Sequence, residues 1–89
     1  MAEIPDGWEA RGKPPTMFRR FGFESYSATR AFLDAVAVLS EKVGLHPQNI
    51  NFASTYVNIT LEANEKGELG KTELDLAEQI NAIYSQPEG

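Results

Sequence analysis

The chain has 89 residues, of which 42% are apolar and 24% charged, so it is one ordinary globular domain and too short for two. It has no cysteine and one histidine, which excludes disulfide bonds, thiolate catalysis and cysteine-ligated zinc. The net charge is −5, yet all four arginines lie in the first third of the chain. That end is suited either to an acidic partner or to plain solvation of scattered charges, whereas the acidic remainder argues against general nucleic-acid binding.

Two strands are predicted near the start of the chain. Residues 8–11 have the pattern of an edge strand, which Pro14 and Pro15 interrupt because proline gives no amide donor to a sheet. Residues 17–23 predict a second strand that pairs with the first as a hairpin. One face of this strand carries Met17, Arg19, Phe21 and Phe23, and the other carries Phe18, Arg20 and Gly22.

A helix is predicted over residues 27–43. Ser25 or Ser27 can cap its start, and Gly44 ends it because glycine tolerates the left-handed conformation common just past a helix. The residues at helical spacing that should face the sheet are Phe32, Val36, Leu39 and Val43. Residues 31–39 include one polar side chain in nine, so a neighbouring helix or a second subunit is expected to cover part of the remaining apolar surface. The residues concerned are Leu33, Ala35 and Val38.

Two further strands are predicted over residues 49–53 and 55–62, joined near Ser54. The second alternates cleanly, with Val57, Ile59 and Leu61 on one face and Tyr56, Asn58, Thr60 and Glu62 on the other. A polar loop over residues 64–70 then leads into a helix that continues to about Tyr84. Its expected capping pair is Thr72 with Asp75.

This order of elements predicts an α+β fold, in which a four-stranded antiparallel sheet has helices packed on one face. Residues 1–89 form a single domain, with flexible ends over 1–7 and 85–89. The second sheet face stays open and is suited either to hydrogen bonding with a partner or to plain solvation. The candidate partner-binding residues there are Asn51, Tyr56, Asn58 and Thr60, and the region of Arg19 and Arg20 is the alternative surface.

The most informative segment is Glu41-Lys42-Val43-Gly44-Leu45-His46-Pro47, followed by the strand at 56–61 and the segment 69–77. Together these resemble the pterin-4a-carbinolamine dehydratase family. That family has a glutamate, three residues, His-His-Pro, a strand ending near a third histidine, and a helix opened by an acidic residue. The likeness covers nearly the whole chain and implies the same fold.

The resemblance also implies where a dehydratase site would lie. In the family, histidines surround the pterin and supply the acid and base groups that expel its 4a-hydroxyl as water. Here Leu45 stands for the first histidine of the pair, His46 keeps the second, and Asn64 stands for the third. Leucine cannot transfer protons, and asparagine is neither acid nor base near neutral pH. The positions that remain are Glu41, His46, Pro47 and Glu73.

These losses predict a protein that is not an enzyme and that uses no cofactor and no metal. His46 is then expected to order its turn or to make an exposed contact, and a catalytic remnant is the alternative. A scaffold without its site points toward binding.

Several short segments resemble a narrower branch, the dehydratase-like RuBisCO assembly factors of α-carboxysomes. They are Ser27–Arg30, Phe32–Asp34, Leu39–Glu41 with Gly44–Leu45, and Thr55–Leu61. The resemblance implies a noncatalytic chaperone for RuBisCO subunits in the bacterial cytoplasm, with carboxysome association, and the family's habit together with the apolar helix implies a homodimer. An active or residual dehydratase and a transcriptional coactivator-like module are the alternatives. No apolar run approaches the about 18 residues of a membrane span, so no membrane partner is expected.

Overall fold

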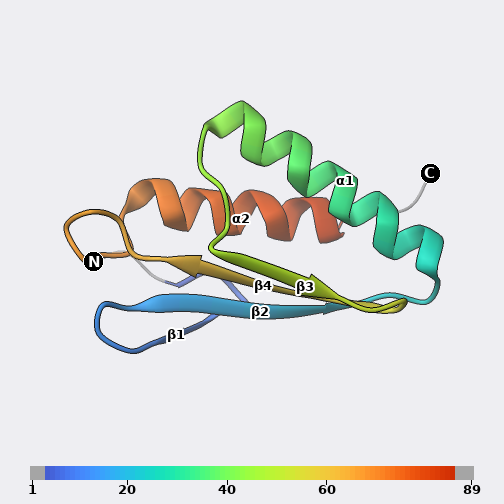
Figure 1. Cartoon of the computed structure of the whole chain (residues 1–89), viewed down its shortest axis with the longest axis horizontal. Helices are drawn as coiled ribbons and strands as arrows, with labels where there is room; N and C mark the ends of the chain where they lie inside the picture. The colour runs from blue at the N-terminus through green and yellow to red at the C-terminus, as the bar shows by residue number, and fades with distance from the viewer. Residues whose placement is uncertain (1–3, 86–89) are drawn as a thin grey trace.

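The computed structural model describes residues 4–85 and contains one sheet and two helices (Figure 1). The elements in chain order are β1 (Glu9–Arg11), β2 (Thr16–Gly22), α1 (Tyr26–Val43), β3 (Asn49–Phe52), β4 (Tyr56–Glu62) and α2 (Lys71–Ser85). This is the predicted order, and the boundaries differ from the predicted ones by a few residues at most. Of the two ends predicted to be flexible, residues 1–3 and 86–89 lie outside the described residues.

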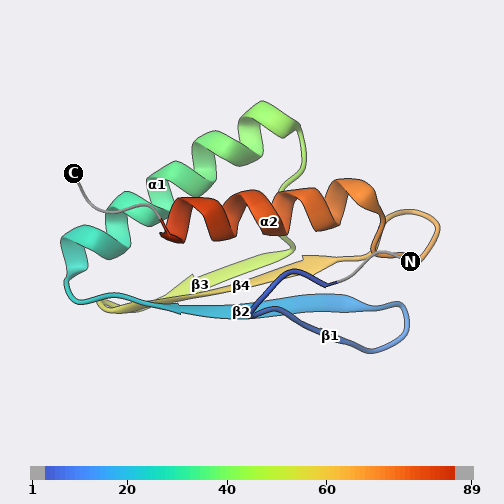
Figure 2. The same ribbon diagram turned by 180° about the vertical axis from the view of Figure 1, so that it is seen from behind.

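The sheet has the strand order β1-β2-β4-β3, and every neighbouring pair is antiparallel. The two seven-residue strands, β2 and β4, form its centre, and the short strands β1 and β3 form its edges. Both helices lie on the same face, as the front and back views show (Figures 1 and 2). The predicted α+β architecture is therefore confirmed, and one face of the sheet has no helix over it.

The core lies between the sheet and the helices, because alternate residues of β2 and β4 are apolar and meet the apolar stripes of α1 and α2. The buried apolar side chains are Trp8, Met17, Phe21, Phe32, Val36, Leu39, Val57, Ile59, Leu61, Leu74, Leu76, Ala77 and Ile80. The rings of Phe21, Phe23, Phe32 and Tyr84 form a cluster, in which the Phe21 ring centroid is 4.8 Å from that of Phe32 and 5.0 Å from that of Tyr84. The predicted facing of both strands is thus correct.

The helix ends follow from short-range hydrogen bonds. Ser25 caps α1, since its hydroxyl accepts a hydrogen bond from the Ala28 amide at 3.1 Å, and Gly44 ends the helix with φ of 74°. The predicted capping pair of α2 is wrong. The Glu73 carboxylate instead accepts a hydrogen bond from the Gly70 amide at 2.8 Å, which satisfies a donor that the first helical turn leaves free.

A polar cluster ties the N-terminal segment to α2. The Arg19 guanidinium donates to the Asp6 carbonyl at 3.1 Å and to the Asn81 side-chain oxygen at 2.6 Å. The Trp8 indole N–H donates to the same oxygen at 2.9 Å, and the Asn81 amide group donates back to the Asp6 carbonyl at 3.0 Å. Gly7 has φ of +84°, and a Cβ there would lie 2.6 Å from the guanidinium, so only glycine fits this approach. Asp6 and Gly7 are accordingly held in place.

Some apolar side chains of the helix layer stay uncovered. Val38 on α1 is 68% exposed, and Val43, which was predicted to face the sheet, is 37% exposed. Leu33, which was expected to be covered by a neighbouring helix or a second subunit, is partly buried against the core. On β3, Ile50 and Phe52 pair with the buried Ile59 and Val57 and so share their face, yet Phe52 is 51% exposed. Neither helix among the described residues is long and apolar enough to cross a membrane.

Candidate functional site

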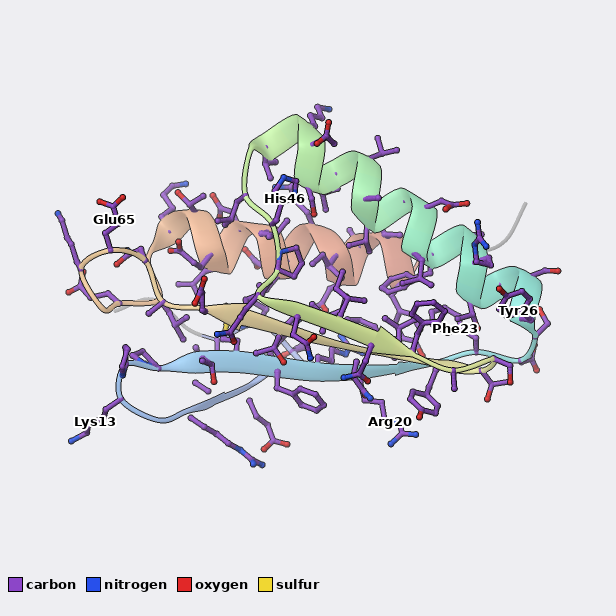
Figure 3. The ribbon with its side chains drawn as sticks, viewed as in Figure 1. Lys13, Arg20, Phe23, Tyr26, His46 and Glu65 are labelled. Atoms are coloured by element: carbon purple, nitrogen blue, oxygen red, sulfur yellow. The ribbon has the colours of Figure 1, made fainter. Side chains whose placement is uncertain are left out.

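The positions that resemble the dehydratase pattern fall at two places in the fold. The first lies at the end of α1, where the Nε2 atom of His46 is 4.0 Å from a carboxylate oxygen of Glu41 (Figure 3). Both side chains are mostly exposed, at 63% and 81%, so this contact is a weak surface pair. Leu45 is partly buried against the core, and Pro47 is also half-buried.

The second place is the loop before α2. Asn64 accepts hydrogen bonds from the backbone amides of Lys66 and Glu68 at 2.9 and 3.1 Å. A Cβ added to Gly70 would lie 2.9 Å from the Asn64 amide nitrogen and 3.2 Å from a Glu73 carboxylate oxygen, so both side chains flank this glycine. Glu73 is only 5% exposed and is held by its capping bond. Asn64 and Glu73 thus shape the loop and open the helix.

A dehydration needs an acid and a base that both reach the reacting atoms. At the first place the described residues provide His46 and the exposed Glu41 carboxylate. At the second they provide the Asn64 amide and the buried Glu73 carboxylate, which caps the helix. The described residues also form a groove of about 780 Å³ between α1, α2 and the β2–α1 connection, which none of the dehydratase-pattern positions lines. No group of three or more potential metal ligands occurs within residues 4–85.

The uncovered side of the sheet carries a different set of groups. We call it the open face and define it by the outward residues of all four strands: Glu9, Arg11, Thr16, Phe18, Arg20, Gly22, Asn49, Asn51, Tyr56, Asn58, Thr60 and Glu62. The strand register places Arg20 opposite Asn58, and Asn58 opposite Asn51. The predicted residues Asn51, Tyr56, Asn58 and Thr60 therefore do share one surface.

Two side-chain pairs organise the centre of the open face. The guanidinium carbon of Arg20 lies 4.0 Å from the centroid of the Tyr56 ring, which is a cation–π contact. The Asn58 amide nitrogen donates to the Asn51 side-chain oxygen at 2.9 Å, while the buried Asn58 oxygen has no partner among the described residues. The centre thus combines an aromatic ring, a cation and amide groups, as binding surfaces often do.

The two arginines proposed as one alternative surface lie on opposite faces. Figure 3 shows Arg20 pointing away from the helices, whereas Arg19 lies on their side, 4.6 Å from the Phe21 ring centroid and 5.2 Å from that of Tyr84. Adjacent residues of a strand must diverge in this way. The grouping of Arg19 with Arg20 is therefore corrected, because Arg19 belongs to the internal packing.

Two residues of this surface and its support were missed from the sequence. Phe18 is 39% exposed on the open face beside Arg20. The strand alternation placed it on this face, yet it is not among the predicted partner-binding residues. Asn81 orders Arg19 and Trp8 from 62 and 73 residues away, and nothing in its local sequence signals that role.

Comparison with known proteins gives three findings at the level of sequence. A family model described as pterin 4 alpha carbinolamine dehydratase matches residues 1–83. A Prochlorococcus marinus (strain MIT 9215) protein is 34% identical over 97% of this chain and 85% of its own length. A Rhodopseudomonas palustris (strain BisB18) protein is 31% identical over 97% of this chain and 83% of its own length. Both relatives carry pterin-4-alpha-carbinolamine dehydratase as a provisional name.

Two solved structures share the fold. One, described as a pterin dehydratase-like protein and RuBisCO assembly factor in the alpha-carboxysome, is 53% identical with a TM-score of 0.83, covering 91% of this chain and 93% of the other. The second, a transcriptional coactivator/pterin dehydratase from Brucella melitensis, is 27% identical with a TM-score of 0.80, covering 90% and 84%. The chain therefore belongs to the pterin 4 alpha carbinolamine dehydratase family.

Proposed function

We propose that this protein is a noncatalytic RuBisCO assembly factor, a chaperone acting in the cytoplasm and at the α-carboxysome of carbon-fixing bacteria. The observation that carries the proposal is the 53% identity, over most of both chains, to the structure described as such a factor. The dehydratase-named relatives are 30 to 34% identical, and this lower identity supports the proposal.

The site geometry supports the noncatalytic part of the proposal. Leu45 packs against the core and Asn64 holds a loop, so neither position supplies a proton-transfer group. The Glu73 carboxylate caps α2 by accepting a hydrogen bond from the Gly70 amide. One exposed histidine beside an exposed glutamate does not replace a set of histidines around a bound pterin.

The proposal includes a homodimer, which the uncovered apolar residues support. β3 is an edge strand, and Ile50 and Phe52 stand uncovered on its helix side. Exposed edges and apolar side chains of this kind invite pairing with a second copy. Analytical ultracentrifugation of the purified protein at micromolar concentration should give the mass of a dimer. The Phe52→Lys variant should shift the measured mass toward that of a monomer. A monomeric wild type would contradict this part.

The test of function is coexpression. The large and small subunits of a form I RuBisCO from a bacterium with α-carboxysomes are produced in a heterologous host with and without this protein. Soluble holoenzyme should rise several-fold where assembly is otherwise limiting, and an unrelated small protein expressed from the same promoter serves as the control. An unchanged yield of holoenzyme would refute the assembly role.

A residual dehydratase is the second candidate, favoured by the dehydratase-named relatives and by the retained His46 beside Glu41. It is tested by turnover of 4a-hydroxytetrahydropterin with wild type and with His46→Ala. We expect no turnover above the uncatalysed rate for either protein. Turnover by the wild type that His46→Ala abolishes would overturn the noncatalytic assignment.

A further inference from the structure

The open face combines exposed aromatic side chains with an arginine, whereas a face that only contacts water needs neither. Phe18 and Tyr56 expose aromatic surface on either side of Arg20, and the described part of the face includes no lysine. Tyrosine and arginine are enriched at the centres of protein interfaces, where lysine and glutamate are depleted. The centre of the open face therefore has the composition of a binding surface rather than of an average strand surface.

Two charged groups on this face, the Arg20 guanidinium and the Glu62 carboxylate, have no ion-pair partner among the described residues. Arg11 pairs with Glu9 at 2.8 Å at the β1 edge, and Glu62 accepts a hydrogen bond from Gln48 at 3.3 Å at the other end. Arg20 makes no ion pair with any described residue, and its guanidinium rests on the Tyr56 ring. The guanidinium lies over the ring, and none of its N–H groups donates a hydrogen bond to a described side chain. These free donors match a carboxylate, which arginine binds through two parallel hydrogen bonds.

The neighbouring amides add a second requirement. Asn58 lies opposite Arg20 in the strand ladder, and its buried side-chain oxygen lacks a donor among the described residues. Buried polar atoms without a partner are uncommon in folded proteins. A partner that brings a hydrogen-bond donor to this oxygen would satisfy it. The amide pair therefore favours a partner that brings hydrogen-bonding groups as well as a carboxylate.

The same features argue against two other occupants. A nucleic acid needs several cations along its backbone, whereas Arg20 is the single unpaired cation of the described open face. A second copy docked face to face across a two-fold axis at the centre would bring Arg20 against Arg20. Like charges at such a contact oppose association.

We propose that the open face binds a protein surface that presents a carboxylate to Arg20 beside hydrogen-bonding groups for the Asn51–Asn58 pair. This inference rests on the proposed function, because the partner is then a RuBisCO subunit. Arg20 and Tyr56 are the anchor, and the surrounding polar residues provide complementarity. The carboxylate requirement is specific to this face and does not involve the dehydratase-pattern positions.

The experiment compares four full-length proteins in the coexpression assay and in pull-down with the RuBisCO subunits: wild type, Arg20→Glu, Arg20→Lys and the control Lys66→Glu. Lys66→Glu makes the same change of charge in the exposed loop before α2. Arg20→Glu should weaken binding by about tenfold or more, because it repels the carboxylate, and Arg20→Lys should fall between it and wild type. Lys66→Glu should bind as wild type does. Circular dichroism of each variant establishes that it is folded.

The outcomes separate the two proposals. If wild type does not raise holoenzyme yield, the proposed function fails. If wild type raises it and folded Arg20→Glu does so equally, the assigned surface is wrong while the function stands. Loss of the dimer in Arg20→Glu, or Arg20-dependent binding of a fluorescent DNA duplex, would instead assign the face to a second copy or to nucleic acid and overturn the inference.

Discussion

The two faces of the sheet use the same residue types for opposite purposes, and β2 shows this within two neighbouring positions. Arg19 lies on the helix side, where two aromatic rings, a carbonyl and the Asn81 oxygen hold its guanidinium. Arg20 lies on the open side and rests on the single Tyr56 ring. The contrast teaches that residue type alone does not separate an arginine of the fold from an arginine left for a partner. The face of the strand on which it lies, and the groups that hold it there, do.

The largest expected difference between the faces concerns two phenylalanines of β2. Phe21 is fully buried, so Phe21→Ala should reduce the free energy of unfolding by about 3–5 kcal/mol. Phe18 is partly exposed on the other face, so Phe18→Ala should cost less than about 1 kcal/mol. Urea denaturation at one protein concentration measures both. Equal losses would mean that the open face is covered in solution.

The two arginines give the next effect. Arg19→Ala removes the hydrogen bonds to Asp6 and Asn81, and should lower the unfolding free energy by about 1–3 kcal/mol. Arg20→Ala removes one exposed cation–π contact and should cost at most about 1 kcal/mol. Thermal melts of the two variants side by side measure the difference. A greater loss for Arg20→Ala would reverse the assignment of fold and surface roles.

Glu73 tests whether a dehydratase-pattern position has become part of the helix layer. Glu73→Ala leaves the Gly70 amide without its acceptor and should lower stability by about 0.5–2 kcal/mol. Glu73→Gln keeps an oxygen acceptor and should restore most of the loss. Urea denaturation of the three proteins reports the order, and a glutamine variant as unstable as the alanine variant would rule out the capping role.

The smallest effect is expected at His46. Its ring is mostly exposed and lies at the 4.0 Å limit of an ion pair with Glu41, so His46→Ala should change stability by less than about 0.5 kcal/mol. The same denaturation assay measures it. A loss of more than about 1 kcal/mol would mean that the turn before β3 depends on this histidine.

Periodicity predicted the sheet and its faces well, because burial on one side imposes strict alternation on β2 and β4. It also placed Arg19 and Arg20 on opposite faces. The prediction of one binding surface that includes both arginines did not take that alternation into account. The choice between Ser25 and Ser27 as the cap of α1 stayed open, because both hydroxyls precede the same apolar pattern. Only the bond from the Ala28 amide decides for Ser25.

The missed features depend on contacts that no local pattern contains. The cap of α2 is at Gly70, and glycine has no side chain that identifies it as a capping residue in the sequence. The usual preference for serine or threonine therefore led to the prediction of Thr72. Asn81 acquires its role only when the chain brings it to Trp8 and Asp6. The dehydratase-pattern residues were located by resemblance, but their present hydrogen-bond partners were not predictable from that pattern.

The hydrogen bond from the Asn81 amide group to the Asp6 carbonyl has a consequence for when the domain can fold during its synthesis. Its two residues are 75 positions apart, so nearly the whole chain must leave the ribosome before the N-terminal segment can close on α2. Trp8 is the single tryptophan of the chain, and its indole N–H donates to the Asn81 side-chain oxygen. Its fluorescence therefore provides an intrinsic optical signal for the closure of the N-terminal segment on α2.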